Sequence, residues 1–417
     1  MLAAIKSGFK KIDFYYVLIV VYVLWLLSLK NRQTGGMDDF DVFFKAGERL
    51  LNGENIYGPP HYYNLKYFYS VLFAGIMGSI QSLGINTVKW IWFVLNTALF
   101  VRIFFLLRIY IFKTEKSSAL IFFFLLLLFG KIVLVNYTFN QISVLILWTM
   151  FEAYHLMKKG HWVWAILILC LGINIKIMPI VLAPYFVVMG KKPLQIVGLG
   201  IAALMFFLYL PALFIGFETN QFLIGEWLKT LNPVSDIHVM QTYEYGFTDL
   251  SSMLTKFLSA EPVYLEPQLN FADLSRSTLF LITNAIRALL LGLVVYLAVK
   301  AKRPVFGVET SVIVVAGFMA LIPLCFPHQR EYSFMFSMPM FAILMLIIAK
   351  LKSTTYYILF IVFVALAGNL VWVDFAGQTA VDVFKHYRLI TLGMIAIFLL
   401  YIYLATKLSS QNTVSED

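Results

Sequence analysis

Long apolar runs are the feature that most constrains this chain. They follow one another with short polar breaks, at about 14–29, 89–107, 118–135, 142–157, 162–175, 178–189, 194–216, 277–299, 306–325, 332–349, 354–373 and 389–406. A helix needs about 20 mostly apolar residues to cross a bilayer. Hydrophobic residues make up 61% of the chain and charged residues 13%, against about 45–50% and about 25% in a soluble domain. We predict an all-α polytopic membrane protein with about twelve transmembrane helices.

The same composition sets the domain organisation and excludes several classes. Because no stretch separates as a soluble domain, residues 1–417 are expected to form one transmembrane domain. The two cysteines, Cys170 and Cys325, lie in apolar runs and offer neither a disulfide framework nor metal-ligand spacing. The net charge of +10 comes from short clusters between apolar runs. This pattern favours the lipid bilayer as a partner and argues against nucleic acid.

The basic residues indicate the orientation. Sixteen of the 32 Lys and Arg residues fall in the loops of one side, and 16 of the 22 acidic residues fall on the other. Short loops rich in Lys and Arg stay in the cytoplasm, so both termini are expected there, in a multi-pass protein of the inner (cytoplasmic) membrane. The first apolar run is interpreted as an uncleaved span. Two long loops, at about 30–88 and 218–276, then fall on the outer side.

The first outer loop begins with an amphipathic segment. Over residues 40–51 the apolar side chains share one face at helical spacing, and Lys45, Glu48 and Arg49 take the other. This pattern is typical of a helix that lies in the membrane interface. Tyrosines further along the loop suit the headgroup zone. We therefore predict an interfacial amphipathic helix in this loop.

Three carboxylates, Asp38, Asp39 and Asp41, stand where this helix begins. An acidic side chain caps a helix by accepting hydrogen bonds from its free amide groups, but one would suffice. Closely spaced carboxylates raise one another's pKa, which suits a general base, and they can hold a divalent ion. From the residues alone, capping and catalysis stand equal, and no cofactor is indicated. An ion pair with Lys45, four residues on, would make Asp41 the poorer base.

Several polar residues interrupt the apolar runs near the outer face. Lys131 is expected to extend its ammonium group to the interface, and Asn140-Gln141 could cap the helix that follows. Lys176 differs, because Pro179 breaks the helix beside it, and a charge in a membrane segment costs at least about 2.5–3.5 kcal/mol near the centre. We interpret Lys176 as a candidate phosphate clamp.

A further polar group lies in the turn between two late apolar runs, where His328, Arg330 and Glu331 follow Pro327. Arg330 offers bidentate geometry for phosphate, and His328 can donate a hydrogen bond to a developing negative charge. A solvated turn is the alternative interpretation. Ordinary solvated loop positions are expected for the later residues Asp374, Asp382, His386 and Arg388.

Other chemistries lack their motifs. The chain has no Walker loop, no dinucleotide glycine fingerprint and no HExxH sequence. An enzyme of this composition would take an activated substrate from the membrane itself. A transporter or flippase of lipid-linked sugars would also use intramembrane Lys and Gln, but it would concentrate polar residues at mid-membrane. A non-catalytic subunit of a cell-wall complex is the third hypothesis.

Residues 39–57 resemble a known family. The stretch Asp39-Phe40-Asp41-Val42-Phe43-Phe44-Lys45-Ala46-Gly47, followed by Leu50-Leu51-Asn52-Gly53 and Tyr57, is similar to the first-loop motif of glycosyltransferase family 87. That family comprises polyprenol-phosphate-mannose-dependent α-1,2-mannosyltransferases of the GT-C superfamily. Its later motifs resemble Tyr67-Phe68-Tyr69-Ser70-Val71, with Val71 in place of the usual Pro, Asn140-Gln141-Ile142-Ser143, Lys176-Ile177-Met178-Pro179 and, loosely, His328 to Tyr332.

The resemblance implies a GT-C-like fold with an active site on the outer face. The donor would be a polyprenyl-phosphate sugar, either mannose or another hexose or pentose, and the acceptor a glycolipid or glycan. Transfer would be inverting. Asp39 aligns with the family's aspartate and would be the general base, with Asp41 as the alternative. The remaining expected roles are donor-phosphate binding by Lys176, Arg330 and His328, and substrate binding by Gln141, Asn140 and Tyr69.

Overall fold

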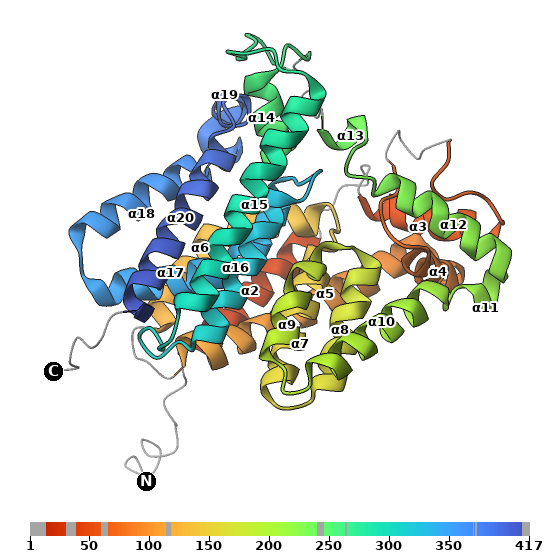
Figure 1. The fold of residues 1–417 in the computed structure, drawn as a ribbon, viewed down its shortest axis with the longest axis horizontal. Helices are drawn as coiled ribbons and strands as arrows, with labels where there is room; N and C mark the ends of the chain where they lie inside the picture. The colour runs from red at the N-terminus through yellow and green to blue at the C-terminus, as the bar shows by residue number, and fades with distance from the viewer. Residues whose placement is uncertain are drawn as a thin grey trace.

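The computed structural model describes residues 14–30, 39–59, 66–113, 118–239, 246–262, 265–369, 371 and 373–410. Over these residues the chain is helical, and its extended pairing is confined to two isolated bridges, Phe247 with Arg330 and Val305 with Val308. Figure 1 shows the helices packed into one bundle with a group of short helices at its right-hand edge. The predicted all-α class is confirmed for the described residues.

The predicted apolar runs all form helices. These are α2 (Phe14–Lys30), α5 (Ile85–Leu107) continued by η2 (Arg108–Phe112), α6 (Ser118–Thr138), α7 (Ser143–Lys158), α8 (Trp162–Ile175), η3 (Met178–Leu182) with α9 (Ala183–Met189), α10 (Pro193–Tyr209) with α11 (Ala212–Ile215), α15 (Arg276–Lys300), α16 (Thr310–Cys325), η4 (Glu331–Ser337) with α17 (Met338–Leu351), α18 (Thr354–Leu366) and α20 (Leu389–Ser410). The run interrupted at Lys176 is a broken helix, because the backbone of Lys176 is extended.

The number of membrane crossings is only partly fixed by these helices. Among the described residues, six helical stretches are long and apolar enough to span a bilayer: Ile85–Phe112, Ala119–Thr138, Pro193–Ile215, Arg276–Lys300, Glu331–Leu351 and Leu389–Ser410. Five shorter apolar helices of 10–17 residues accompany them. The protein is therefore a multi-pass membrane protein, whereas the count of twelve crossings stays a prediction.

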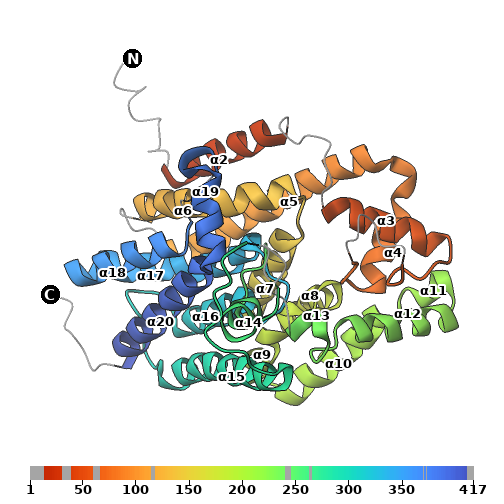
Figure 2. The same ribbon diagram turned by 90° about the horizontal axis from the view of Figure 1, so that it is seen from above.

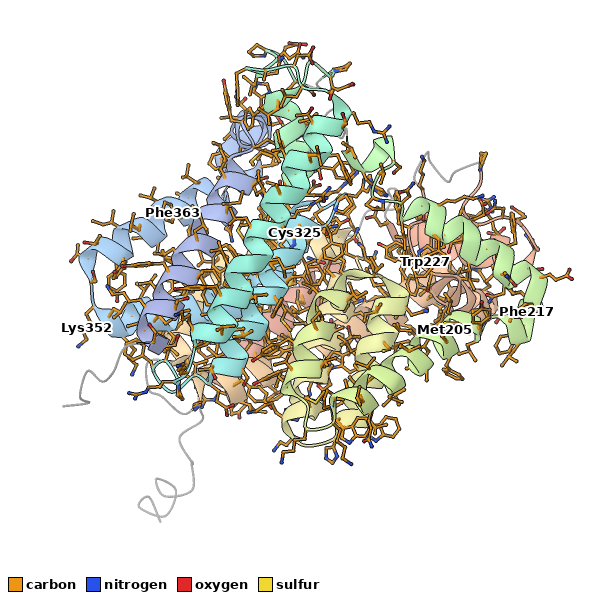
Figure 3. All side chains as sticks on the ribbon, in the orientation of Figure 1. Met205, Phe217, Trp227, Cys325, Lys352 and Phe363 are labelled. Carbon is orange, nitrogen blue, oxygen red and sulfur yellow. The ribbon has the colours of Figure 1, made fainter. Side chains whose placement is uncertain are left out.

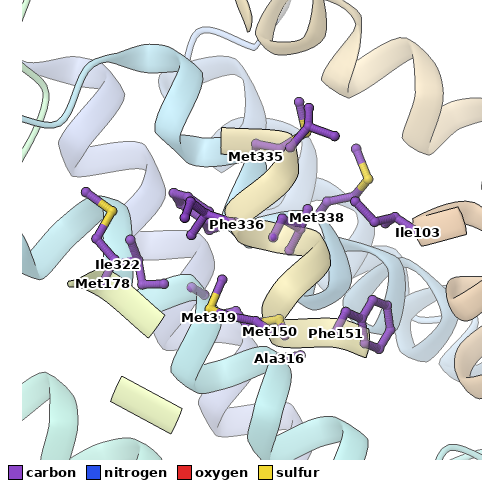
Figure 4. Close-up of a cluster of buried hydrophobic side chains, with 14 of the residues drawn as sticks. Ile103, Met150, Phe151, Met178, Ala316, Met319, Ile322, Met335, Phe336 and Met338 are labelled. Atoms are coloured by element: carbon purple, nitrogen blue, oxygen red, sulfur yellow. The ribbon is translucent and has the colours of Figure 1, made fainter. Parts of the chain in front are cut away.

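The core of the bundle lies around α16 and α17. Every residue of α16 from Val312 to Leu324 is buried, as is α17 from Met338 to Leu344, since a helix that is apolar on all sides belongs in an interior. Figure 4 shows side chains of α5, α7, η3 and η4 meeting α16 in this core, among them several methionines. Methionine is flexible enough to fill irregular gaps between helices.

The two predicted outer loops contain short helices. The first holds α3 (Asp39–Leu51), α4 (Val71–Ser79) and η1 (Gln81–Leu83), and the second holds α12 (Phe217–Thr230), α13 (Asp236–Val239) and α14 (Leu250–Leu258). In Figure 1, α13 and α14 lie at the upper end with α19 (Val373–His386). Lys352, in one of the basic loops, lies at the left-hand edge of Figure 3, below Phe363 of α18. Figure 2, seen from above, shows α13 and α14 over the bundle and α3 and α4 beside α11 and α12. Which end faces the cytoplasm stays a prediction.

The predicted amphipathic segment is helix α3. Its apolar residues Phe40, Phe43 and Leu50 are buried, and the helix packs on α4 of the same chain. Gly47 permits this approach, because a Cβ atom there would lie 2.5 Å from the backbone nitrogen of Gly78. Protein therefore covers the face that was expected to meet lipid, and the place of α3 in the membrane interface stays a prediction.

One member of the predicted polar face of α3 is also buried. The guanidinium of Arg49 donates to Glu54 at 2.9 Å, to the carbonyl of Asn55 at 2.6 Å and to that of Gly58 at 3.0 Å. Its donors thus satisfy carbonyl groups of the turn after α3. Arg49 fixes the exit of the helix and is not a solvated side chain, so this part of the sequence prediction was wrong.

Candidate active site

Asp39 lies at the start of α3 and contacts Gln141, two residues before the start of α7. The side-chain amide nitrogen of Gln141 donates a hydrogen bond to Oδ2 of Asp39, across 102 positions of sequence. Gln141 is only 2% exposed, so this contact is sheltered from water. A hydrogen bond to one carboxylate oxygen fixes the plane of the group. The predicted base and a predicted substrate-binding residue are thus in direct contact. Asp38 lies outside the described residues.

Asp41 has a different partner from the one expected. Its Oδ1 atom lies 2.6 Å from Nζ of Lys89 in α5, whereas Lys45 pairs with Glu48 at 2.9 Å. The predicted Asp41–Lys45 pair was therefore wrong, because α5 supplies a lysine that sequence spacing does not reveal. The functional consequence is the same, since a carboxylate engaged by an ammonium is less accessible to an acceptor hydroxyl.

Tyr69 and Lys176 lie beside Asp39. The Lys176 ammonium stands 5.1 Å from the centroid of the Tyr69 ring, which suits a cation–π contact. The ring of Tyr69 is buried edge-on against Phe43, at 4.7 Å between centroids. Burial raises the pKa of Tyr69 well above its ordinary value, and the nearby Tyr332 and Asp39 raise it further. The phenol therefore stays neutral and can donate a hydrogen bond.

Lys176 is a cation without a carboxylate partner among the residues the structure describes. Its contact there is the Tyr69 ring, and its backbone nitrogen ends α8 by donating to Gly172. Burial lowers the pKa of Lys176 to about 8, while the charge of Asp39 acts in the opposite direction. A buried ammonium that lacks an anion is energetically costly. This arrangement suits an anionic ligand.

Asn140 holds the turn that places Gln141. Its backbone adopts a φ of +48°, which asparagine tolerates better than most residues. Its carbonyl accepts a hydrogen bond of 3.0 Å from the indole nitrogen of Trp92. Asn140, Gln141 and Trp92 line a small cavity together with Asn96 and Asn136. Whether Asn140 contacts substrate stays a prediction.

His328 is part of a histidine pair that the sequence did not reveal. Nε2 of His238 lies 2.8 Å from the carbonyl of Thr230, so it carries the proton, and Nδ1 of His238 must then accept. Nε2 of His328, 2.7 Å away, is consequently the donor of the second bond. Burial lowers the pKa of both rings, that of His328 to about 3. The Nε2 proton of neutral His328 is thus committed to His238, and its predicted role as a donor to phosphate stays a prediction.

The cations expected to bind phosphate gather around this ring. The positive charges of Lys176, Lys66 and Arg330 all act to lower the pKa of His328. The guanidinium of Arg330 lies 5.6 Å from the ring centroid of Phe247, whose edge also packs against His328 at 5.1 Å. The structure therefore brings Arg330 and Lys176 to the same histidine from distant parts of the chain. Lys66 was missed because it stands in no motif.

Comparison with known protein families gives one match. The sequence model of glycosyltransferase family 87 matches residues 67–327, more than half of the chain. The chain belongs to glycosyltransferase family 87. Searches of curated proteins and of solved structures found no significant match. The suspected resemblance is confirmed, and the matched range contains Gln141 and Lys176 but not Asp39 or Arg330.

Membership of glycosyltransferase family 87 makes this protein a membrane glycosyltransferase. It gives no support to the transporter hypothesis. It also leaves the donor, the acceptor and the site residues to be argued from geometry. Within the described residues no group of three or more His, Cys, Asp or Glu side chains could hold a metal ion.

Lys131 forms an ion pair, with its ammonium 2.6 Å from Glu331, and its place at the membrane interface stays a prediction. One further prediction for the family 87 protein was wrong, because His386 and Arg388, expected in solvent, are buried. Nη1 of Arg388 donates to the carbonyl of Phe247, and His386 lies 3.1 Å from the ammonium of Lys256. Charges of the last loop thus pack against the second of the two predicted outer loops.

Proposed function

We propose that this family 87 glycosyltransferase moves a sugar from a polyprenyl-phosphate donor to a lipid- or glycan-linked acceptor. The transfer takes place on the outer face of the cytoplasmic membrane and inverts the anomeric carbon. The observation that supports it most is the meeting of a carboxylate and a cation that has no ion pair among the described residues. Asp39 acts electrostatically on both Lys176 and Tyr69, so a base and a phosphate clamp share one site.

Asp39 is the proposed general base. Its carboxylate takes the proton of the acceptor hydroxyl while that oxygen forms a bond to the anomeric carbon. The Gln141 amide, which already donates to Oδ2, holds the carboxylate in one orientation during this step. Asp41 is less suited, because Lys89 lies 2.6 Å from it. Asp41 remains the alternative base that experiment should separate from Asp39.

Lys176 and Arg330 are the proposed partners of the leaving group. When the bond between the anomeric carbon and the phosphate oxygen breaks, polyprenyl phosphate gains negative charge. Fixed cations in a site of low dielectric stabilise such charge more than water does. Arg330 adds a planar donor pair that matches phosphate geometry. Lys66, whose charge also reaches His328, extends the same positive surface.

His328 takes another role in this proposal. Its Nε2 proton is committed to His238, and an acceptor nitrogen is poorly matched to phosphate oxygens. It is well matched to a sugar hydroxyl, which can donate. The stacked ring of Phe68, at 5.0 Å from His328, supplies an apolar face of the kind on which sugar rings pack. We therefore assign His328 to the donor sugar and not to its phosphate.

The test is sugar transfer by purified protein in nanodiscs. Polyprenyl-phosphate mannose, glucose and arabinose are each incubated with a glycolipid extract, and released polyprenyl phosphate and glycosylated lipid are measured together. One donor should yield both products in equal amounts, with inverted configuration. Asp39→Asn serves as the inactive control and Glu48→Gln, on the same helix, as the matched active one. Equal amounts of product from wild type and Asp39→Asn would overturn the proposal.

The same preparation separates the remaining hypotheses. Protein in liposomes that moves a labelled lipid-linked sugar across the bilayer without forming a new glycosidic bond would be a flippase. Protein that binds a partner complex but neither transfers nor moves sugar would be a scaffold subunit. The pairing of Asp39 with Gln141 favours the enzyme, because neither alternative needs an oriented carboxylate.

A further inference from the structure

The loop that carries the proposed phosphate ligand is held by one short segment of the second outer loop. Arg330 follows Gln329, whose carbonyl accepts a hydrogen bond of 2.7 Å from the backbone nitrogen of Thr248. The backbone nitrogen of Gln329 donates in return to Oδ2 of Asp249 at 3.2 Å. Both polar groups of the Gln329 backbone are thus bound by neighbouring residues of that segment.

Asp249 uses both carboxylate oxygens. Oδ1 accepts from the backbone nitrogen of Ser252 at 3.1 Å and caps α14, while Oδ2 serves Gln329. An asparagine has a single side-chain oxygen, so it could satisfy only one of these amides. Asp249 is completely buried, although an ordinary cap needs only an exposed Ser or Asn. The residue is therefore more than a helix cap.

The segment is itself anchored from the far side. The guanidinium of Arg388 donates to the carbonyl of Phe247, and the hydroxyl of Thr391 donates to the carbonyl of Thr248 at 2.8 Å. Burial raises the pKa of Asp249, whereas its two backbone hydrogen bonds and the charges of Arg287 and Arg388 lower it. A continuous series of hydrogen bonds thus connects α20 through Thr248 to Gln329 and holds the three segments together.

The side chain of Gln329 is not the group that these backbone hydrogen bonds present to a ligand. Its amide nitrogen donates to the carbonyl of Pro327 at 2.7 Å, and the residue is buried. The groups whose direction depends on the Gln329 backbone are its neighbours, His328 and Arg330. His328 has a φ of +58°, a strained value for a residue with a side chain, which persists only where the surroundings impose it.

We propose that Asp249 is a positioning residue, which aims Arg330 and His328 at the donor by fixing the backbone of Gln329. This inference rests on the proposed function for its ligand, but its geometry can be tested without substrate. The residue acts through Arg330 and touches neither donor nor acceptor.

Hydrogen exchange tests, without any donor, whether Asp249 holds the backbone of Gln329. In Asp249→Ala, which removes both side-chain acceptors, the amide of Gln329 should exchange at least tenfold faster than in wild type. Asp273→Ala is the matched control, because Asp273 also accepts from a backbone amide, that of Ala260 at 3.0 Å, in the same predicted outer loop. Unchanged exchange over residues 326–331 in Asp249→Ala would overturn the proposal.

A double-mutant cycle tests the link to Arg330. Asp249→Ala should raise the donor KM about tenfold in the wild-type background and hardly at all in Arg330→Ala, because the residue it positions is then missing. Equal fold-changes in both backgrounds would show a merely structural role and overturn the positioning assignment. If the wild type transfers no sugar, the proposed function fails, while hydrogen exchange still tests whether Asp249 holds the Gln329 backbone. If Asp249→Ala does not fold, Thr391→Val loosens Thr248 and is measured in the same way.

Discussion

Charged residues near the two ends of the helical bundle differ in their partners. At the end that carries the basic loops, Arg102 donates twice to Glu152, at 2.7 and 2.8 Å, and Lys158 lies 2.5 Å from Glu309. At the other end Asp41 and Lys131 are also paired, with Lys89 and Glu331, but Lys176 has no ion pair within the described residues and lies over an aromatic ring. Paired charges in or near a bilayer stabilise the fold, whereas an unpaired one is retained for a ligand.

The proposed base, Asp39, at the end opposite the basic loops, should show the largest effect of all. Asp39→Asn keeps the shape of the side chain but cannot accept a proton, so turnover should fall by about 10²- to 10⁴-fold with donor affinity retained. Asp41→Asn should cost far less, since Lys89 already engages that carboxylate. Transfer rate and donor affinity are measured for both variants. A dead Asp41→Asn beside an active Asp39→Asn would reverse the assignment.

Matched lysines at the two ends provide the next test. Lys176→Ala should weaken donor binding by about 10- to 100-fold, because a hydrogen bond to a charged group contributes about 1.5–3 kcal/mol. Lys158→Ala removes a lysine that is already paired with Glu309 and should leave donor binding unchanged. Binding of a donor analogue to each variant decides the comparison. Equal losses of donor affinity in the two variants would contradict the difference between Lys176 and Lys158.

Loss of the Arg102–Glu152 ion pair should lower the stability of the protein but not its activity. Arg102→Met leaves Glu152 without its partner, so we expect a loss of about 1–3 kcal/mol of stability with turnover per folded molecule retained. Arg102→Met combined with Glu152→Leu replaces both partners by apolar groups and should recover most of that loss. Thermal unfolding in detergent measures both variants. A double variant no more stable than the single one would contradict pairing as the purpose of these charges.

The smallest effect should come from pH. Burial lowers the pKa of Lys176 to about 8 from the ordinary 10.5, so its ammonium loses its proton as pH rises through 8. Donor KM should then increase several-fold. In Lys176→Arg, which stays charged, donor KM should not rise above pH 8. Stability changes in the opposite sense: between pH 8 and 10.5 only the unfolded chain binds this proton, so alkaline pH favours the folded state. Kinetics on either side of pH 8, with unfolding measured alongside, tests both signs.

Local sequence was sufficient where the physical cause is local. Each apolar run became a helix because helical hydrophobicity is written in consecutive residues, and α3 formed where its periodicity predicted. Lys176 was recognisable because Pro179 follows it closely. The partner of Asp41 was not recognisable, since Lys89 reaches it from another helix. Glu331 likewise finds Lys131 across 200 positions, and no spacing rule covers such a distance.

The sequence by itself determined that this protein is a helical membrane protein of glycosyltransferase family 87, and it indicated Asp39, Lys176 and Arg330 as candidates. The tertiary structure decided what surrounds them. It set Gln141 against Asp39, turned His328 into an acceptor through His238, and buried Arg388 behind the loop of Arg330. The reason is physical: hydrophobicity acts on each run separately, but a hydrogen bond needs two groups within about 3 Å, and only the packed helices bring them there.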